Sequence, residues 1–200
     1  MNTVLVEKND MKKVAELLRR GEVVAFPTET VFGLGVKFGD LAYLEKIYEL
    51  KKRDHSKAVT LMVADKNDIE KYAYVSTDAR KVIDAFMPGM MTLILKKKEN
   101  VDDRYTAGLE TIGIRIPDDP FVLQLLKEVG PMLVTSANIS GTPALLTTAE
   151  VYQQFNGKLP LIVKGNCVSQ VASTVVKIDG QVNILRQGLI TKEEIEEVLL

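Results

Sequence analysis

The stretch GEVVAFPTETVFGLGV, residues 21–36, begins as a buried strand and then leaves the strand pattern. The apolar run VVAF ends at Pro27, which has no backbone N–H to donate to a sheet. Thr28, Glu29 and Thr30 follow, before a second apolar run that contains Gly33 and Gly35. Taken alone, the segment favours a turn whose hydroxyls bond local backbone. The alternative is that it turns polar side chains toward a pocket.

Outward from this stretch, apolar runs of strand length alternate with helical patterns along the whole chain. Helices are expected over residues 10–21, 40–53, 76–89 and 120–130, with two more after capping-box patterns at Thr147 and Thr191. Strands are expected over 3–7, 23–26, 58–64, 92–97, 111–117, 131–135, 160–164, 173–178 and 182–186. Because the two types intermingle, we predict one α/β domain over residues 1–200, with a twisted mixed sheet flanked by helices.

Composition excludes several classes of protein. The 200 residues are 46% hydrophobic and 26% charged, as in soluble globular domains, and contain no apolar run of ~18 residues that could span a membrane. The first ten residues lack the features of a secretory signal, so a cytoplasmic protein is expected. The net charge is −1, so any anion site must be a local cluster of cations.

The scarcity of histidine and cysteine also limits the chemistry. His55 and Cys167 are single, so neither an internal disulfide nor a usual zinc site is expected, and Ser-His-Asp or Cys-His catalysis would have to use His55. P-loop and dinucleotide fingerprints are absent from the sequence. We therefore expect no enzyme nucleophile, no dedicated metal ligands, and a site that binds and orients anionic substrates.

Four polar segments adjoin strand or helix ends, and each offers hydroxyls or cations. They are PTET (27–30), KKRDHSK (51–57) with Lys51, Arg53 and Lys57, VTSANISG (134–141) with Thr135, Ser136 and Asn138, and VAST (171–174) with Ser173 and Thr174. Each has a plainer interpretation: a local turn, a solvated helix end, a capping loop, or the start of a strand. His55 is expected to be an exposed bystander, and Cys167 a small, partly buried side chain.

Two arginines lie within apolar strands, Arg115 in IGIRIP and Arg186 in NILRQG. Strand alternation places Ile114 and Ile116 on one face and Arg115 on the other. A buried guanidinium is costly unless an anion meets it, and its planar fork suits a carboxylate or phosphate. An internal Asp or Glu and a bound ligand are equally plausible partners for Arg115.

Taken in order, these segments resemble the YrdC/TsaC family, the threonylcarbamoyl-AMP synthases. The resemblance runs from about Gly21 to Gly188 and rests on seven motifs: PTETVFGLG, Lys51 and Arg53 as K-x-R, PGMMT, IGIRIP, Ser136 and Asn138 as S-x-N, STVV, and LRQG. The chain departs from the common K-G-R-P pattern at Lys52 and Asp54, and has Ala58 where a proline is common. Met62 stands where some members carry a histidine, and PGMMT replaces P-G-P-L-T.

The resemblance implies a fold with a concave, positively lined cavity and a reaction of L-threonine, bicarbonate or CO2 and ATP. The products would be threonylcarbamoyl-AMP and pyrophosphate, made by a nucleotidyltransferase for partner proteins that form threonylcarbamoyladenosine in tRNA. It also implies that Mg2+ accompanies ATP. In this interpretation Thr30, Arg115, Thr135 and Ser173 bind threonine. Contacts to ATP would come from Lys51, Arg53, Lys57, Thr106, Ser136, Asn138 and Arg186.

Two alternatives belong to other functional classes. The first is a non-catalytic module that binds double-stranded RNA or tRNA, which the near-neutral charge and the lack of aromatic stacking motifs disfavour. The second is a paralogue that binds a nucleotide but does not use threonine, suggested by the altered KKRDHSKAV segment. Formation of AMP-linked product and pyrophosphate distinguishes these readings.

Overall fold

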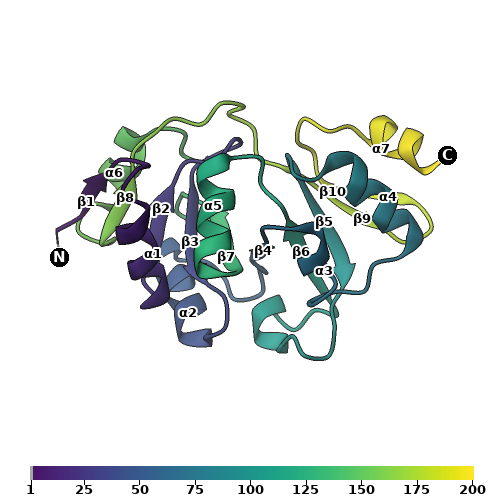
Figure 1. Cartoon of the computed structure of the whole chain (residues 1–200), viewed down its shortest axis with the longest axis horizontal. Helices are drawn as coiled ribbons and strands as arrows, with labels where there is room; N and C mark the ends of the chain where they lie inside the picture. The colour runs from purple at the N-terminus through teal and green to yellow at the C-terminus, as the bar shows by residue number, and fades with distance from the viewer. Residues whose placement is uncertain (1) are drawn as a thin grey trace.

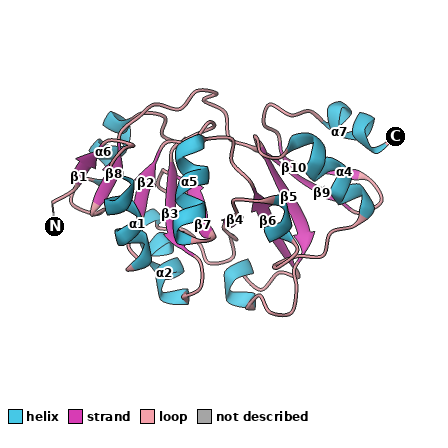
Figure 2. Cartoon of the chain, viewed as in Figure 1, coloured by secondary structure: helices cyan, strands magenta, loops and turns pink. Residues whose placement is uncertain are grey.

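The apolar runs pair into one large mixed sheet with helices on both faces (Figures 1 and 2). The computed structural model describes residues 2–200. The strands are β1 (Val4–Val6), β2 (Val24–Phe26), β3 (Gly33–Lys37), β4 (Thr60–Met62), β5 (Met91–Lys96), β6 (Thr111–Arg115), β7 (Met132–Ser136), β8 (Leu161–Val163), β9 (Thr174–Ile178) and β10 (Val182–Arg186). The helices are α1 (Met11–Arg19), α2 (Leu41–Lys51), α3 (Lys66–Ile69), α4 (Thr77–Phe86), the 3-10 helix η1 (Asp103–Thr106), α5 (Pro120–Val129), α6 (Thr148–Phe155) and α7 (Lys192–Leu199).

Within residues 2–200 the sheet has ten strands in the order β1-β8-β2-β3-β7-β4-β6-β5-β9-β10. The pairs β1–β8, β8–β2, β4–β6 and β5–β9 are parallel, and the other neighbours are antiparallel. The two termini lie at opposite ends of this elongated sheet (Figure 1). The prediction of one α/β domain around a mixed sheet is confirmed.

Strand alternation divides the apolar side chains between two cores. On one face, α1 and α5 pack over β2, β7 and β8 through residues such as Leu18, Leu125 and Phe26. On the other face, α2, α4, α6 and α7 cover a larger core that includes Leu61 and Ile114. Because these four helices cover only one face of the sheet, the other face of β4, β5, β6 and β9 is available for a site.

Helix boundaries agree with the capping signals in the sequence. Asp40 accepts a hydrogen bond from the Ala42 N–H, and both capping boxes, at Thr147 and Thr191, are formed. Gly21 follows α1 with a φ of +73°, as expected for a helix end. No helix within residues 2–200 combines the length and apolar character that a membrane span requires.

Three elements were not expected from the sequence: β3, α3 and η1. Glycine weakens strand propensity, and β3 contains two. In the sheet Gly33 and Gly35 face the ring of Phe26 on the neighbouring strand; a Cβ on Gly35 would lie 2.7 Å from Phe26 Cε1. The glycines therefore make room for an aromatic side chain.

Candidate ligand-binding cavity

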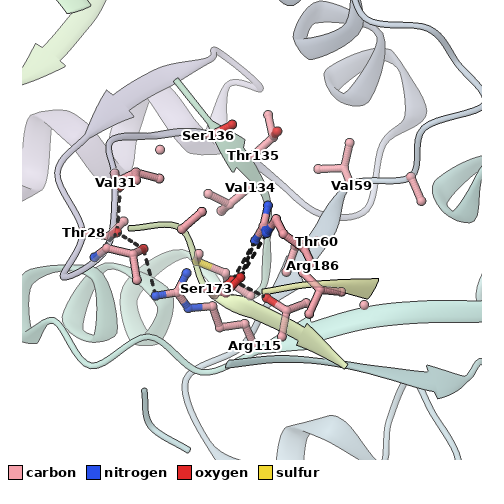
Figure 3. A pocket seen from close by; sticks show the side chains of 18 of the residues that line it. Thr28, Val31, Val59, Thr60, Arg115, Val134, Thr135, Ser136, Ser173 and Arg186 are labelled. Atoms are coloured by element: carbon pink, nitrogen blue, oxygen red, sulfur yellow. Dashed lines mark hydrogen bonds between the residues drawn. The ribbon is translucent and has the colours of Figure 1, made fainter. Parts of the chain in front are cut away.

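A cavity of about 290 Å³ lies on the surface of β4, β5, β6, β7 and β9 that faces away from the larger core (Figure 3). Alternation explains its floor, because Leu61, Leu93 and Ile114 point into the core while their neighbours point into the cavity. Twenty-one residues line it: Thr28, Thr30, Val31, Phe32, Gly33, Arg53, Ala58, Val59, Thr60, Met62, Thr92, Ile94, Gly113, Arg115, Val134, Thr135, Ser136, Ala172, Ser173, Val175 and Arg186. Among residues 2–200, this lining holds three arginines and no carboxylate.

The PTET segment forms one wall of the cavity and is held by its own hydroxyls. Thr28 Oγ1 donates to the Val31 carbonyl at 2.8 Å and accepts from the Thr30 N–H at 3.1 Å. Thr30 Oγ1 lies 2.9 Å from Thr28 Oγ1 and accepts from Arg115 Nη2 at 3.1 Å. Both sequence interpretations thus hold together: the segment is a self-bonded turn, and it faces a pocket.

The Arg115 guanidinium is buried, with 5% of the residue exposed, and has an internal anion partner. Its Nη2 donates to Glu29 Oε1 at 2.6 Å, and its Nε donates to the Gly89 carbonyl at 3.1 Å. Glu29 Oε1 also accepts from the Asp118 N–H at 2.9 Å. The two alternatives for Arg115 are therefore not exclusive, because it pairs with a carboxylate and still lines the cavity.

Arg186 meets the cavity from β10 and is fixed by Ser173. Its Nε and Nη2 donate to the Ser173 carbonyl at 3.0 and 2.8 Å, and Nη2 also donates to Ser173 Oγ at 3.0 Å. Ser173 Oγ lies 2.9 Å from Thr92 Oγ1 on β5. Burial, and secondly the positive charge of Arg115, lower the pKa of Arg186. Two guanidinium groups that repel each other across one cavity make a site for an anion.

Lys51 ends α2 beneath the segment 136–142 and is completely buried. Its Nζ donates to the Asn138 carbonyl at 2.7 Å, to Asn138 Oδ1 at 3.0 Å, and to the Ser136 carbonyl. Ser136 Oγ in turn donates to Asn138 Oδ1 at 2.6 Å. Burial first, and then the Arg53 charge, lower the pKa of Lys51 to about 7. Lys51 therefore holds the loop that presents Ser136.

Arg53 anchors the segment that connects α2 to β4. Its Nε donates to the Lys57 carbonyl at 3.0 Å and its Nη2 donates to the Ala58 carbonyl at 2.8 Å. Burial lowers the pKa of Arg53, and the residue lines the cavity beside Ala58 and Val59. The K-x-R pair thus divides into a buried support, Lys51, and a guanidinium at the cavity, Arg53.

Of the eleven residues to which the resemblance gives a role in binding threonine or ATP, seven meet in this cavity: Thr30, Arg53, Arg115, Thr135, Ser136, Ser173 and Arg186. Four do not line it: Lys51, Lys57, Thr106 and Asn138. Lys51 and Asn138 lie behind Ser136, and Lys57 is exposed on the K-x-R segment. In this structure Lys51 and Asn138 therefore support the loop of Ser136, and the contact of these residues with a triphosphate stays a prediction.

The contact expected between Thr106 and ATP also stays a prediction. Thr106 is buried in η1, where its hydroxyl donates to the Leu109 carbonyl at 2.7 Å and lies 3.1 Å from the Asp103 carbonyl. That hydroxyl serves the local turn. The sequence analysis gave no role to Glu29 or to Thr92, although Glu29 lies in PTET and Thr92 in PGMMT. The only signal for Glu29 was its position as a charged residue between Thr28 and Thr30.

The strand register separates the two ends of the cavity. Met62 pairs with Arg115 on β6 and with Met132 on β7. Ser136 lies four residues beyond Met132, so at ~3.3 Å per residue it is roughly 13 Å along the strand from the level of Arg115. Figure 3 shows Arg115 and Thr28 on one side and Thr135 and Ser136 on the other, with the Arg186 guanidinium between.

A family model for Sua5, YciO and YrdC proteins, described as telomere recombination, matches residues 16–188. A putative threonylcarbamoyl-AMP synthase of Methanocaldococcus jannaschii is 37% identical over 191 residues, which cover 92% of this chain and 90% of that protein. The threonylcarbamoyl-AMP synthase of Bacillus subtilis is 40% identical; the match covers 94% of this chain but spans 56% of that relative.

Two solved structures share the fold. P. abyssi Sua5 complexed with L-threonine has a TM-score of 0.93 and 33% identity, with 98% of this chain and 61% of that one covered. E. coli YciO has a TM-score of 0.86 and 26% identity, with 97% and 98% covered. By sequence and by fold, the chain belongs to the Sua5/YciO/YrdC family.

Proposed function

We propose that this chain is a threonylcarbamoyl-AMP synthase. It condenses L-threonine, bicarbonate or CO2 and ATP to threonylcarbamoyl-AMP and pyrophosphate, and is thus a nucleotidyltransferase. The names of relatives that are 30–40% identical over at least 90% of the chain support this assignment. The product would pass to partner proteins that form threonylcarbamoyladenosine in tRNA.

The observation that carries the proposal is the convergence of Arg115, Ser136 and Arg186 on one cavity. Arg115 lies with the hydroxyls of Thr30 and Ser173 at the end suited to an amino acid, since a guanidinium matches a carboxylate and hydroxyls match the polar groups of threonine. Arg53 and Ser136 lie at the other end, where the Arg53 N–H groups not bound to the Lys57 and Ala58 carbonyls can donate to phosphate oxygens. Arg186 lies between them.

The chemistry requires positioning more than an enzyme nucleophile. The threonine ammonium loses one proton to water, and the free amine forms a C–N bond to CO2 while one C=O π bond opens to an oxyanion. Loss of a second proton from the nitrogen to water leaves the carbamate. A carbamate oxygen then forms a bond to the α-phosphorus of ATP, while the bond from that phosphorus to the β-phosphate bridging oxygen breaks and pyrophosphate leaves. Such an in-line displacement depends mainly on alignment and on neutralising phosphate charge. The lack of a histidine or cysteine in the lining is no obstacle.

Three residues support the binding groups from behind. Lys51 and Asn138 hold the loop of Ser136, and Thr92 contacts Ser173. Residues 2–200 contain no cluster of three or more His, Cys, Asp or Glu side chains that could hold a metal ion. We therefore assign Mg2+ to the triphosphate, where it would neutralise charge, and derive no step from it.

The test is formation of pyrophosphate and of an AMP-linked product of the expected mass from ATP, bicarbonate and L-threonine. L-valine and L-serine in place of threonine are the matched controls, because they lack the hydroxyl or the methyl group. Affinity for RNA without turnover would support an RNA-binding module, and ATP binding without threonine dependence would support the nucleotide-binding paralogue. Either result overturns the proposal.

A further inference from the structure

Glu29 is a buried carboxylate beside the cavity, and it contacts Arg115 alone among the cavity's arginines. Its residue is 8% exposed, and its Oε1 takes both the Arg115 Nη2 donor and the Asp118 N–H. Its Oε2 is buried and has no hydrogen-bond partner within residues 2–200. The charge of Glu29 is therefore directed at one guanidinium and is little quenched by other donors.

This pairing gives the two ends of the cavity different charge. Arg115 with Glu29 sums to zero at one end. Arg53 and Arg186 make no ion pair within residues 2–200, since their bonds go to carbonyl and hydroxyl oxygens. Outside the Arg115–Glu29 pair the cavity thus keeps two uncompensated positive charges, Arg186 in the middle and Arg53 toward the end assigned to phosphate.

A cavity that is neutral at one end and positive elsewhere binds ligand groups of different charge at different places. A free amino acid carries an ammonium beside its carboxylate, and an unpaired arginine would repel the ammonium while it attracted the carboxylate. A neutral arginine–carboxylate pair removes that repulsion, whereas a polyanion gains more at the end with two cations. We propose that Glu29 is a positioning residue that makes the Arg115 end selective for a zwitterion and keeps phosphate groups from it.

Hydrogen-bond direction supports the same assignment. Arg115 donates to Thr30 Oγ1, and Thr28 Oγ1, which gives its proton to the Val31 carbonyl, is left to accept the Thr30 hydroxyl proton. With its proton so used, Thr30 Oγ1 offers the ligand only an acceptor. An acceptor suits the N–H or O–H groups of an amino acid and has nothing to give a phosphate oxygen.

The inference rests on the proposed function, because it presumes that threonine and a nucleotide share the cavity. The variant Glu29→Gln keeps the size of the side chain and an acceptor for the Asp118 N–H, but removes the charge. The matched control is Glu128→Gln, which removes a carboxylate from an exposed ion pair with Arg19, between α1 and α5. L-threonine binding is titrated calorimetrically in the full chain, with and without inorganic pyrophosphate.

In Glu29→Gln we expect the Kd for threonine to rise about tenfold or more, and pyrophosphate to compete with threonine. In the unmodified chain and in Glu128→Gln, threonine binding should not weaken when pyrophosphate is added. Unchanged threonine affinity in Glu29→Gln, or a loss of affinity without new competition, overturns the charge-sorting role. Absence of threonine binding by the unmodified chain would instead contradict the proposed function.

A second variant keeps the inference testable if Glu29→Gln does not fold. The double variant with Glu29→Gln and Arg115→Gln removes the whole ion pair and retains a net charge of zero at this end. It should lose threonine affinity and show no binding of pyrophosphate beyond that of the unmodified chain. Competition between pyrophosphate and threonine in the unmodified chain, which needs no variant, would overturn the inference by itself.

Discussion

Arg186 and Ser173 are joined by three hydrogen bonds, two to the Ser173 carbonyl and one to its hydroxyl. This contact ties the end of β10 to the residue before β9 and points the guanidinium into the cavity (Figure 3). Because Nε and Nη2 of Arg186 are both bound to Ser173, the planar guanidinium is held in one orientation, and the Nη1 N–H groups have a fixed direction.

Replacing this fork by a single ammonium tests the geometry. In Arg186→Lys the charge stays but the bidentate contact with Ser173 cannot form, so ATP should bind about tenfold more weakly or worse. Calorimetric titration with a non-hydrolysable ATP analogue measures this. Arg104→Lys, at an exposed arginine of η1, is the control. Equal ATP affinity in all three proteins would show that orientation of Arg186 is unimportant.

Thr30→Val removes the acceptor for Arg115 Nη2 while keeping the shape of the side chain. One N–H of Arg115 Nη2 then loses its acceptor, at a cost of about 1–3 kcal/mol, which corresponds to roughly fivefold to 150-fold in the KM for threonine. The KM for ATP should change little, since Thr30 lies at the Arg115 end. Steady-state kinetics with each substrate varied in turn separates the two effects. Equal changes in both constants contradict the role given to Thr30.

Lys51 makes stability depend on pH in a defined direction. Its pKa is lowered from 10.5 to about 7 by burial and by Arg53. Between these values the unfolded chain holds a proton that the folded chain has lost, so the free energy of unfolding rises with pH, by up to about 1.4 kcal/mol per unit. Below pH 7 both states are protonated and Lys51 adds no slope.

Urea unfolding of Lys51→Met at pH 6.5 and pH 8.5 tests this assignment. The unmodified chain should gain stability relative to the variant between these two pH values, because methionine has no proton to lose. Lys12→Met, on the exposed side of α1, should follow the unmodified chain. Parallel pH profiles for the chain and Lys51→Met would rule out the proposed titration.

Lys52 occupies a backbone conformation that favours glycine. It follows α2 with φ 50° and ψ 45°, in the left-handed region, which costs a non-glycine residue about 1–2 kcal/mol. Lys52→Gly relieves this cost and adds about 0.5–1 kcal/mol of chain entropy in the unfolded state. The net gain in unfolding free energy should be about 0.5–1 kcal/mol by urea denaturation. Lys57 has no positive φ, so Lys57→Gly should not raise the unfolding free energy. A stabilised Lys57→Gly together with an unstabilised Lys52→Gly would refute the argument.

Gly188 lies where any side chain would collide with backbone atoms of the segment before β9. A Cβ there would lie 2.5 Å from the Ala172 carbonyl oxygen and 2.8 Å from the Ser173 carbonyl carbon. Gly188→Ala should therefore displace the segment that carries Arg186, lower the unfolding free energy by about 1–3 kcal/mol, and weaken ATP binding. Leu189→Ala, at an exposed neighbour, should change neither the unfolding free energy nor ATP binding. A Gly188→Ala variant with unchanged thermal stability would contradict the close approach of Gly188 to this backbone.

Local sequence patterns predict some features of this site but not others. Alternation around Arg115 was sufficient to predict its face, because period-two geometry is independent of tertiary context. The buried position of Lys51 could not be predicted, since a helix end with a flexible lysine reads equally well as solvated. The local bonds of Thr106 could not be predicted either, because a hydroxyl in a polar loop gives no sign that it donates to a carbonyl three residues away. The role of Glu29 could not be predicted without the sheet order, which brings the segment after β2 next to the end of β6.

The cavity draws on strands from residue 33 to residue 186, and adjacent strands in the sheet are often far apart along the chain. β9 pairs with β5 across about eighty intervening positions, and β10 pairs with β9 last of all. Contacts of such long sequence separation form slowly and together. A chain emerging from the ribosome therefore has no partial affinity for either substrate, and acquires both only when its final hairpin closes onto the sheet.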